Sequence, residues 1–214
     1  MKNRKAFITG ICSTYLKDKE INFLKKHKPW GVILFSRNIK NVRQTKELIN
    51  QIKSCFNDNK YPILIDEEGG KVSRLKKIIV NSNFSSRFFG KLFKKNKNKF
   101  FYQYKMYVNN ISNILNDLGI NINTVPVLDV VRKKTNKVIS DRCFSRNNKI
   151  VSKLGDYCIK LYSNNHIGTV IKHIPGQGLA VGDSHFSTPI VKENKKILNT
   201  IDFLLLKIKN LYLP

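Results

Sequence analysis

Short apolar runs alternate with longer amphipathic stretches along this chain. The apolar runs have the length of buried strands and lie at residues 7–11, 31–35, 62–65, 122–128 and 167–171. Helical patterns of apolar and polar positions separate them, at about residues 17–26, 42–56, 100–118 and 149–164. This alternation predicts βαβ units and a parallel sheet, an α/β fold.

Two segments are less regular. Residues 91–99 are rich in Lys and Asn, which predicts a solvated loop or the start of a helix. The basic N-terminus precedes a short apolar stretch that Thr9 and Gly10 interrupt, and no small-residue cleavage site follows it. This favours a first barrel strand over a signal peptide.

Charged or polar side chains follow four successive predicted strands. The carboxyl ends of parallel strands meet at one edge of the sheet, where active sites of α/β proteins are built. The sequence therefore predicts a cleft for a hydroxyl-rich ligand. The residues that follow the strands are Ser36-Arg37-Asn38, Asp66-Glu67-Glu68-Gly69-Gly70, Asp129, and Lys172-His173.

The acidic turn after the third strand offers a first candidate. Asp66 could accept hydrogen bonds from two sugar hydroxyls, and the glycines that follow allow a sharp bend close to a ligand. The alternative is an acidic N-cap for a following helix, an interpretation that fits Glu67 and Glu68 better than Asp66. Arg74 could close over the same ligand, although an isolated arginine is more often a solvated side chain.

Three cationic or imidazole groups form a second set of candidates. Arg142 follows the fourth strand, and a structural pairing with Asp141 or Asp129 would explain it equally well. Lys172 and His173 are adjacent, so a strand would point them to opposite faces, but a turn at the strand end could bring both to the cleft. A buried structural histidine remains the alternative for His173.

A carboxylate and an imidazole are spaced two residues apart in a later loop, at Asp183 and His185. The carboxylate could hold the imidazole in one tautomer and stabilise its protonated form, which would make His185 an acid and base near neutral pH. An Asx-turn beside a bystander histidine is the alternative. The sequence contains no P-loop, zinc pattern or nucleophile elbow, so we expect no cofactor and no metal ion.

The chain carries a formal charge of +26. Its lysines are scattered and accompany abundant Asn and Ile, which favours AT-rich coding bias over a nucleic-acid surface. The charge should still attract an anionic substrate. Four separated cysteines without metal-ligand spacing, at Cys12, Cys55, Cys143 and Cys158, favour a reduced cytoplasmic protein, and no apolar run is long enough to cross a membrane.

Five motifs together resemble glycoside hydrolase family 3, and they are most similar to those of its bacterial single-domain β-N-acetylhexosaminidases. The resemblance runs from about residue 6 to residue 195, with the motifs in the family's order and spacing. The motifs are residues 31–38, residues 65–75, residues 125–129, Lys172-His173-Ile174-Pro175-Gly176, and Asp183-Ser184-His185.

The resemblance implies a (β/α)8 TIM-type barrel, of which residues 1–214 would form a truncated catalytic-type domain with about the first five βα units. It implies a retaining hydrolysis of terminal β-linked N-acetylglucosamine from cell-wall muropeptide fragments, in peptidoglycan recycling. His185, held by Asp183, would be the acid/base. The residues that would bind the N-acetylglucosamine unit are Asp66, Arg74, Arg142, Lys172 and His173.

The chain departs from the family pattern at two places. Gln177 stands where the family commonly has His, and the family's nucleophilic Asp belongs to a later strand. Neither Glu193 nor Asp202, the acids that follow His185, lies in a nucleophile motif. We therefore expect little or no glycosidase activity from these residues alone, and a second polypeptide could complete the barrel. The alternatives are an inactive sugar-binding remnant and a basic nucleic-acid-binding protein.

Overall fold

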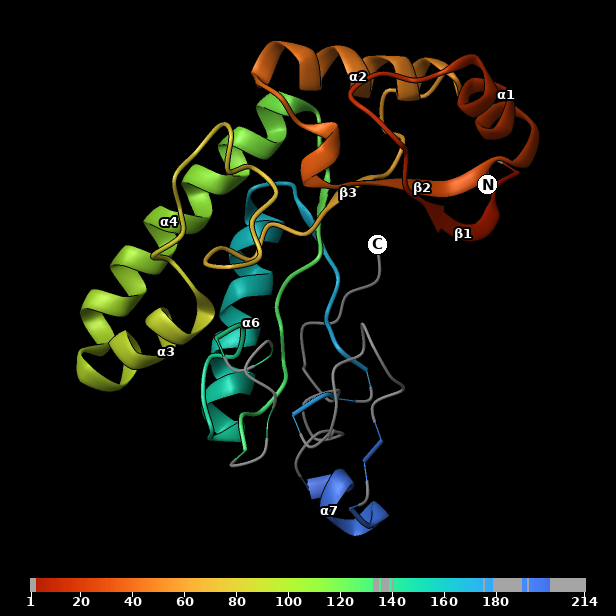
Figure 1. Cartoon of the computed structure of the whole chain (residues 1–214). Coiled ribbons are helices and arrows are strands. Elements are labelled where there is room, and N and C mark those ends of the chain that lie inside the picture. Colours follow the sequence, from red (N-terminus) through yellow and green to blue (C-terminus); the bar gives the residue numbers. More distant parts are fainter. Residues whose placement is uncertain are drawn as a thin grey trace.

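The computed structural model describes residues 3–132, 135, 139, 141–174, 176–178, 190, 191 and 193–200. Its sheet has five parallel strands in the order β1-β2-β3-β4-β5 (Figure 1). The strands are β1 (Lys5–Thr9), β2 (Pro29–Leu34), β3 (Ile63–Ile65), β4 (Ile122–Asn123) and β5 (Gly168–Thr169). The parallel sheet predicted from the apolar runs is therefore confirmed, although the last three strands are shorter than their runs.

Helices occupy the four predicted intervals. An additional helix, α3, lies where the Lys- and Asn-rich segment predicted a loop or a helix start, and that segment ends α3 and begins α4. The helices are α1 (Asp18–His27), the 3-10 helix η1 (Ser36–Asn38), α2 (Val42–Ser54), α3 (Ser86–Lys95), α4 (Lys97–Leu118), α6 (Asn148–Asn164) and α7 (Lys195–Thr200).

Short polar side chains begin the longer helices. Asn41 accepts a hydrogen bond from the backbone N–H of Gln44 and so caps α2. Ser85, Asn96 and Asn147 cap α3, α4 and α6 in the same way. Such caps satisfy backbone donors that the first helical turn leaves unpaired. Gly119, with φ of 86°, ends α4 in the left-handed conformation, as its C-cap position predicted.

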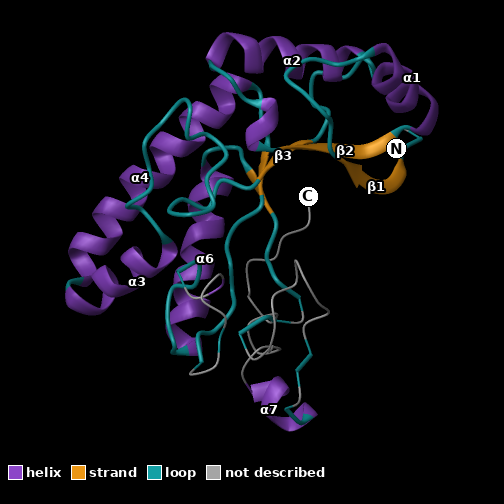
Figure 2. Ribbon diagram, in the orientation of Figure 1, coloured by secondary structure: helices purple, strands orange, loops and turns teal. Residues whose placement is uncertain are grey.

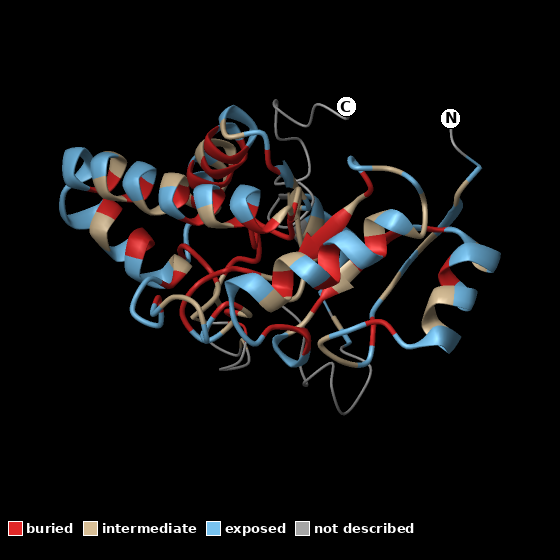
Figure 3. Ribbon diagram, turned by 90° about the horizontal axis from the view of Figure 1, so that it is seen from above, coloured by how far each residue is buried: buried red, intermediate tan, exposed pale blue. Residues whose placement is uncertain are grey.

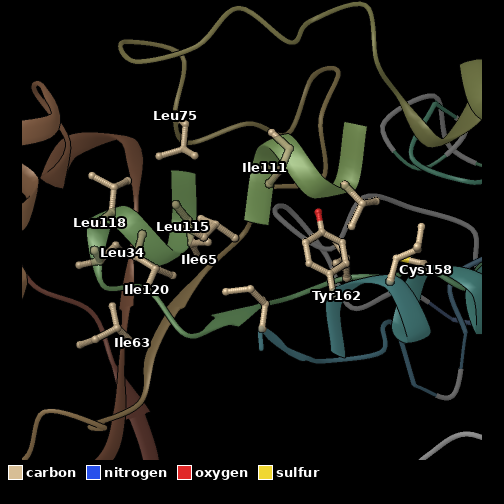
Figure 4. Close-up of a cluster of buried hydrophobic side chains, with 14 of the residues drawn as sticks. Leu34, Ile63, Ile65, Leu75, Ile111, Leu115, Leu118, Ile120, Cys158 and Tyr162 are labelled. Carbon is tan, nitrogen blue, oxygen red and sulfur yellow. The ribbon is translucent and has the colours of Figure 1, made fainter. Parts of the chain in front are cut away.

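The core lies between the sheet and helices α2, α4 and α6. Leu34, Ile63 and Ile65 on the strands are fully buried and belong to one apolar cluster with residues of α2 and α4, and Figure 4 shows them beside Leu115 and Leu118 of α4. The buried faces of the helices form stripes on the sheet side, while their outer faces are exposed (Figure 3). This one-sided burial explains the amphipathic helical patterns in the sequence.

Helices α3 and α4 form a hairpin that is packed through aromatic rings. Phe89 and Phe93 on α3 contact Phe100 and Tyr104 on α4, with ring centroids 4.7–6.4 Å apart. Edge-to-face contacts of this kind stabilise packing beyond the burial of apolar area. The hairpin packs against Phe144, two residues after Arg142, through Gly90 of α3 and Tyr104 of α4.

The strands follow one another around the sheet in sequence order, and α1, α2, α4 and α6 lie on its outer side (Figure 2). Sequential parallel strands with helices on one side define a (β/α)8-type barrel architecture, of which five strands are present among the described residues. The predicted fold class is confirmed. In the described part of the chain, no helix is long and apolar enough to cross a membrane.

Candidate functional site

Three strand ends and one loop converge on a cluster of charged side chains. The pairing of β4 with β5 continues as an isolated bridge between Val127 and Lys172. Leu128 N donates to the Lys172 carbonyl at 2.7 Å. This register brings the Lys172 side chain beside the end of β3. The predicted site residues that the structure brings together are Asp66, Arg74, Arg142, Lys172 and His173.

Asp66 lies directly after β3 and is surrounded by donors. Lys172 Nζ lies 3.0 Å from its Oδ1, and Arg74 Nη2 lies 3.1 Å from its Oδ2. The hydroxyl of Thr124 also donates to Oδ1. Burial alone would raise the pKa of Asp66, but Lys172 and these hydrogen bonds lower it from 3.8 to about 2. Asp66 is therefore a carboxylate acceptor near neutral pH.

Glu68 is the second anionic centre of the cluster. Arg142 binds it through two nitrogens, with Nε at 2.8 Å and Nη2 at 2.9 Å from its carboxylate oxygens. Lys172 Nζ lies 2.5 Å from Glu68 Oε1, so this ammonium links Glu68 to Asp66. The bidentate geometry fixes the orientation of the guanidinium. Arg142 therefore pairs with neither Asp141 nor Asp129, the partners considered from the sequence.

His173 is held between an acid and a guanidinium. Its Nδ1 lies 2.6 Å from Asp129 Oδ2, and its Nε2 lies 3.1 Å from Arg142 Nη2. Arginine nitrogens only donate, so Nε2 must accept, and the proton must be on Nδ1, where it is donated to Asp129. This arrangement assigns His173 to the neutral tautomer. The other oxygen of Asp129 accepts from the backbone N–H of Gln177 at 2.6 Å.

Glu67 points away from this cluster, and its buried carboxylate holds the segment after β3 through hydrogen bonds. The helix N-cap interpretation of the acidic turn is wrong, because α3, the next helix, begins at Ser86 and is capped by Ser85. The carboxylate instead accepts hydrogen bonds from Ser73 Oγ, the backbone N–H groups of Arg74 and Leu75, and Asn81 Nδ2. The burial of Glu67 raises its pKa above 4.5, even though these neutral donors act in the opposite direction.

The backbone of the turn is fixed by its neighbours. Asn123 on β4 accepts from Glu67 N at 3.0 Å and donates to the Glu67 carbonyl at 2.9 Å. Gly69 has φ of 81°, and a Cβ there would lie 2.3 Å from the carbonyl oxygen of Phe84. The predicted sharp bend is present. The close approach that requires glycine is to the chain itself at Phe84.

The polar residues after β2 do not join the cluster. Asn38 is fully buried and donates to the carbonyls of Ile11 and Ser13 at 3.1 and 2.8 Å. Arg37 also donates to the Ile11 carbonyl, at 2.9 Å. The prediction that this strand end lines the cleft with polar groups is therefore wrong, because η1 turns them toward the loop after β1. Only Phe35 approaches the site, with its ring 5.7 Å from Arg74 Cζ.

The predicted acid/base pair and the members of the cluster that were not predicted remain to be placed. Asp183 and His185 lie outside the described residues. Among the described residues, no group of His, Cys, Asp and Glu side chains could hold a metal ion. Sequence reasoning placed Glu68 at this edge of the sheet but favoured a helix N-cap for it, and it missed Thr124 as a member of the cluster. The acidic turn was a signal for Glu68, whereas nothing in the local pattern distinguished Thr124.

Comparison with known proteins identifies the family. Residues 8–206 match the Glycosyl hydrolase family 3 N terminal domain. A "Beta-hexosaminidase A" of Pseudoalteromonas piscicida is 32% identical over 199 residues, which cover 89% of this chain and 32% of that protein. A "Beta-hexosaminidase" of Thioalkalivibrio sulfidiphilus is 28% identical and is covered over 53% of its length. The chain belongs to glycoside hydrolase family 3.

Solved structures agree with this assignment. NagZ from Neisseria gonorrhoeae superimposes with a TM-score of 0.85 at 26% identity, over 96% of this chain and 60% of that one. The same protein in complex with N-trifluoroacetyl-D-glucosamine gives a TM-score of 0.81. The chain thus spans about a third to a half of the two curated relatives and 60% of NagZ.

Proposed function

We propose that the charged cluster binds an N-acetylglucosamine unit and that the whole protein hydrolyses the β-glycosidic bond of that unit, as an O-glycosyl hydrolase. The observation that carries the proposal is the bridge from Lys172 to both Asp66 and Glu68, which joins the ends of β3 and β5 into one polar site. The family membership supports it. So does the complex of NagZ with N-trifluoroacetyl-D-glucosamine, a ligand of the proposed class.

The side chains suit the recognition of sugar hydroxyls. Asp66 is ionised and its side chain is 18% exposed, so its oxygens can accept from a ligand that approaches the strand ends. Arg74, with 28% of its side chain exposed, can donate from the outer side. Lys172 and Arg142 are more buried, and we assign to them donation to the ring substituents deeper in the site.

The chemistry requires a proton donor that these residues do not provide. Asp66, with a pKa of about 2, is deprotonated near neutral pH, and His173 Nε2 is occupied by Arg142. We assign proton transfer to His185, oriented by Asp183. In this scheme His185 protonates the departing glycosidic oxygen while an Asp of a later strand attacks the anomeric carbon. Water, deprotonated by His185, then releases the sugar with retained configuration.

The finer features of the proposal follow from the same resemblance. The substrate would be a muropeptide fragment of peptidoglycan in the cytoplasm, and residues 1–214 would be the N-terminal part of the catalytic barrel. Strands equivalent to the later ones of the relatives would complete it, from a continuous chain or from a second polypeptide. The exposed apolar side chains Ile8, Trp30 and Val170, each at least 40% exposed, are where such strands could pack.

Sugar binding is tested directly by calorimetric titration of residues 1–214 with N-acetylglucosamine. Asp66→Asn should weaken binding by roughly tenfold or more, because it removes charge-assisted hydrogen bonds. Asp117→Asn is the matched control, since Asp117 forms an exposed ion pair with Lys46 away from the site. Equal affinities of the two variants would contradict the assignment of Asp66.

Hydrolysis is tested with a chromogenic β-N-acetylglucosaminide. We expect saturable binding with little or no release of the leaving group by residues 1–214, and turnover when the later strands of a relative are supplied in the same tube. In that reconstituted enzyme Asp183→Ala should abolish turnover while leaving sugar affinity unchanged. Steady turnover by residues 1–214 alone, absent in Asp183→Ala, would refute the need for a later nucleophile.

A further inference from the structure

We propose that a pocket between α3 and residues 143–146 binds a phosphate group. The pocket has a volume of about 150 Å³. This is smaller than the sites that hold drug-sized ligands, which occupy roughly 300–1,000 Å³. It therefore fits a single small group better than a sugar chain. Nothing in the sugar-binding proposal uses its lining residues.

The pocket is lined by cations on both walls. Arg87, Lys91 and Lys94 are spaced by four and three residues along α3, so they lie on one face of the helix. Arg146 lines the opposite wall. Lysine and arginine make up 40 of the 214 residues, about one in five, but four of the nine lining residues, and none of the nine is acidic. The scatter of lysine along the chain does not produce this concentration.

Three of these four cations have no ion-pair partner among the described residues. Lys91, Lys94 and Arg146 are exposed and form no ion pair with any residue of the described part of the chain. Cations that face a common hollow repel one another and raise the local positive potential. A multivalent anion in the hollow would relieve that repulsion and could bind both walls at once.

The two walls are held at a fixed separation. A Cβ at Gly90 would lie 1.7 Å from the carbonyl oxygen of Phe144, so α3 contacts the backbone of the opposite segment directly. Ser145 lines the pocket and is 6% exposed. Its Oγ accepts from Asn147 N at 3.1 Å, which leaves the hydroxyl proton able to donate to a ligand. The pocket thus combines exposed cations with a buried neutral donor.

The geometry favours phosphate over a carboxylate. A tetrahedral phosphate presents oxygens in several directions and can accept from α3, from Arg146 and from Ser145 simultaneously. The pocket is also separate from the sugar site, although the two share a segment. Arg142 directs its guanidinium to Glu68, whereas the next residue, Cys143, lines the pocket.

The test is calorimetric titration of residues 1–214 with inorganic phosphate at constant ionic strength. The double variant Lys91→Gln/Lys94→Gln should weaken phosphate binding by about tenfold or more. The control Lys95→Gln/Lys99→Gln removes the same charge from neighbouring exposed positions outside the pocket and should change the affinity less than about twofold. Arg146→Gln should reproduce the loss from the other wall.

Two results would overturn the proposal. Equal weakening by the double variant and by its control would mean that phosphate responds only to the overall charge. Binding of succinate as tight as that of phosphate, under the same conditions, would mean that the pocket does not select a tetrahedral anion. Selective loss in Lys91→Gln/Lys94→Gln and Arg146→Gln, with weaker succinate binding, supports the phosphate site.

Discussion

Three consecutive acids in the turn after β3 have two different environments. Asp66 and Glu68, the outer carboxylates, face the cations Lys172, Arg74 and Arg142. Glu67, the inner carboxylate, faces only neutral hydroxyl, amide and backbone donors. The pKa of Asp66 is lowered to about 2, while that of Glu67 is raised. Neighbouring acids on one turn are thus shifted in opposite directions.

The two glutamates of the turn are similarly buried but have different hydrogen-bond partners. Both glutamates are buried, Glu67 at 0% and Glu68 at 7% exposure. What separates them is the formal charge of the donors, since cations stabilise a carboxylate far more than neutral donors do. The outer carboxylates hold the charged groups of the site, and the inner one holds the backbone that presents them.

Among these variants, removal of Lys172 should cause the largest loss of unfolding free energy. Lys172→Ala leaves the outer carboxylates without their shared cation, and we expect a loss of about 3–5 kcal/mol in the free energy of unfolding. The pKa of Asp66 should rise, because burial is then opposed by fewer positive groups. Urea denaturation and carboxyl NMR titration measure the two effects. An unchanged pKa of Asp66 would contradict the assigned role of Lys172.

The two glutamates provide the most direct comparison. Glu68→Gln should cost about 2–3 kcal/mol of unfolding free energy, because it removes the charge that Arg142 binds through two hydrogen bonds. Glu67→Gln should cost about 1 kcal/mol, since its donors are neutral and one amide oxygen can still accept. If denaturation showed the opposite order, the degree of burial would be the better explanation.

The pH dependence of stability should have opposite signs for the two acids. Asp66 contributes fully above pH 3.8 and loses its contribution as the pH falls toward 2, so wild type should lose about 2 kcal/mol relative to Asp66→Asn over that interval. The pKa of Glu67 is raised, so wild type should lose stability relative to Glu67→Gln as the pH increases above 4.5. Slopes of the same sign would contradict the comparison.

An exposed ion pair gives the smallest expected change. Lys46 Nζ lies 2.7 Å from Asp117 Oδ1, but their side chains are 40% and 60% exposed. Lys46→Ala should therefore change the unfolding free energy by less than about 1 kcal/mol, because solvent screens such pairs. If Lys46→Ala lost as much unfolding free energy as Lys172→Ala, the burial of the Lys172 ion pairs would not increase their contribution to stability.

Much of the fold could be predicted from the periodic pattern of apolar and polar residues along the chain. The apolar runs and amphipathic intervals predicted the positions of the strands and of α1, α2, α4 and α6. Helix α3 was missed because its second half lies in the Lys- and Asn-rich segment 91–99, and its buried aromatic face packs against α4. Tertiary contacts between aromatic rings, which periodicity over a short window does not resolve, determine that helix.

The site was less predictable than the fold. Asp66, Lys172 and His173 could be expected to approach one another because parallel strands end at one edge. The residues after β2 followed the same rule and yet turned away, because Asn38 satisfies carbonyl groups in the loop after β1. Whether a polar side chain faces the cleft therefore depends on which nearby backbone groups need a hydrogen-bond partner. The sequence alone does not show which groups these are.

The link between Lys172 and Asp66 joins positions 106 residues apart. On a ribosome that adds about 5–20 residues each second, the acidic turn is made roughly 5–20 s before its cation. Until then, Asp66 and Glu68 have only Arg74 and Arg142 as cationic partners, and no cation links the two carboxylates. Synthesis of the segment after β5 therefore also supplies the cation that links the two carboxylates of the candidate site.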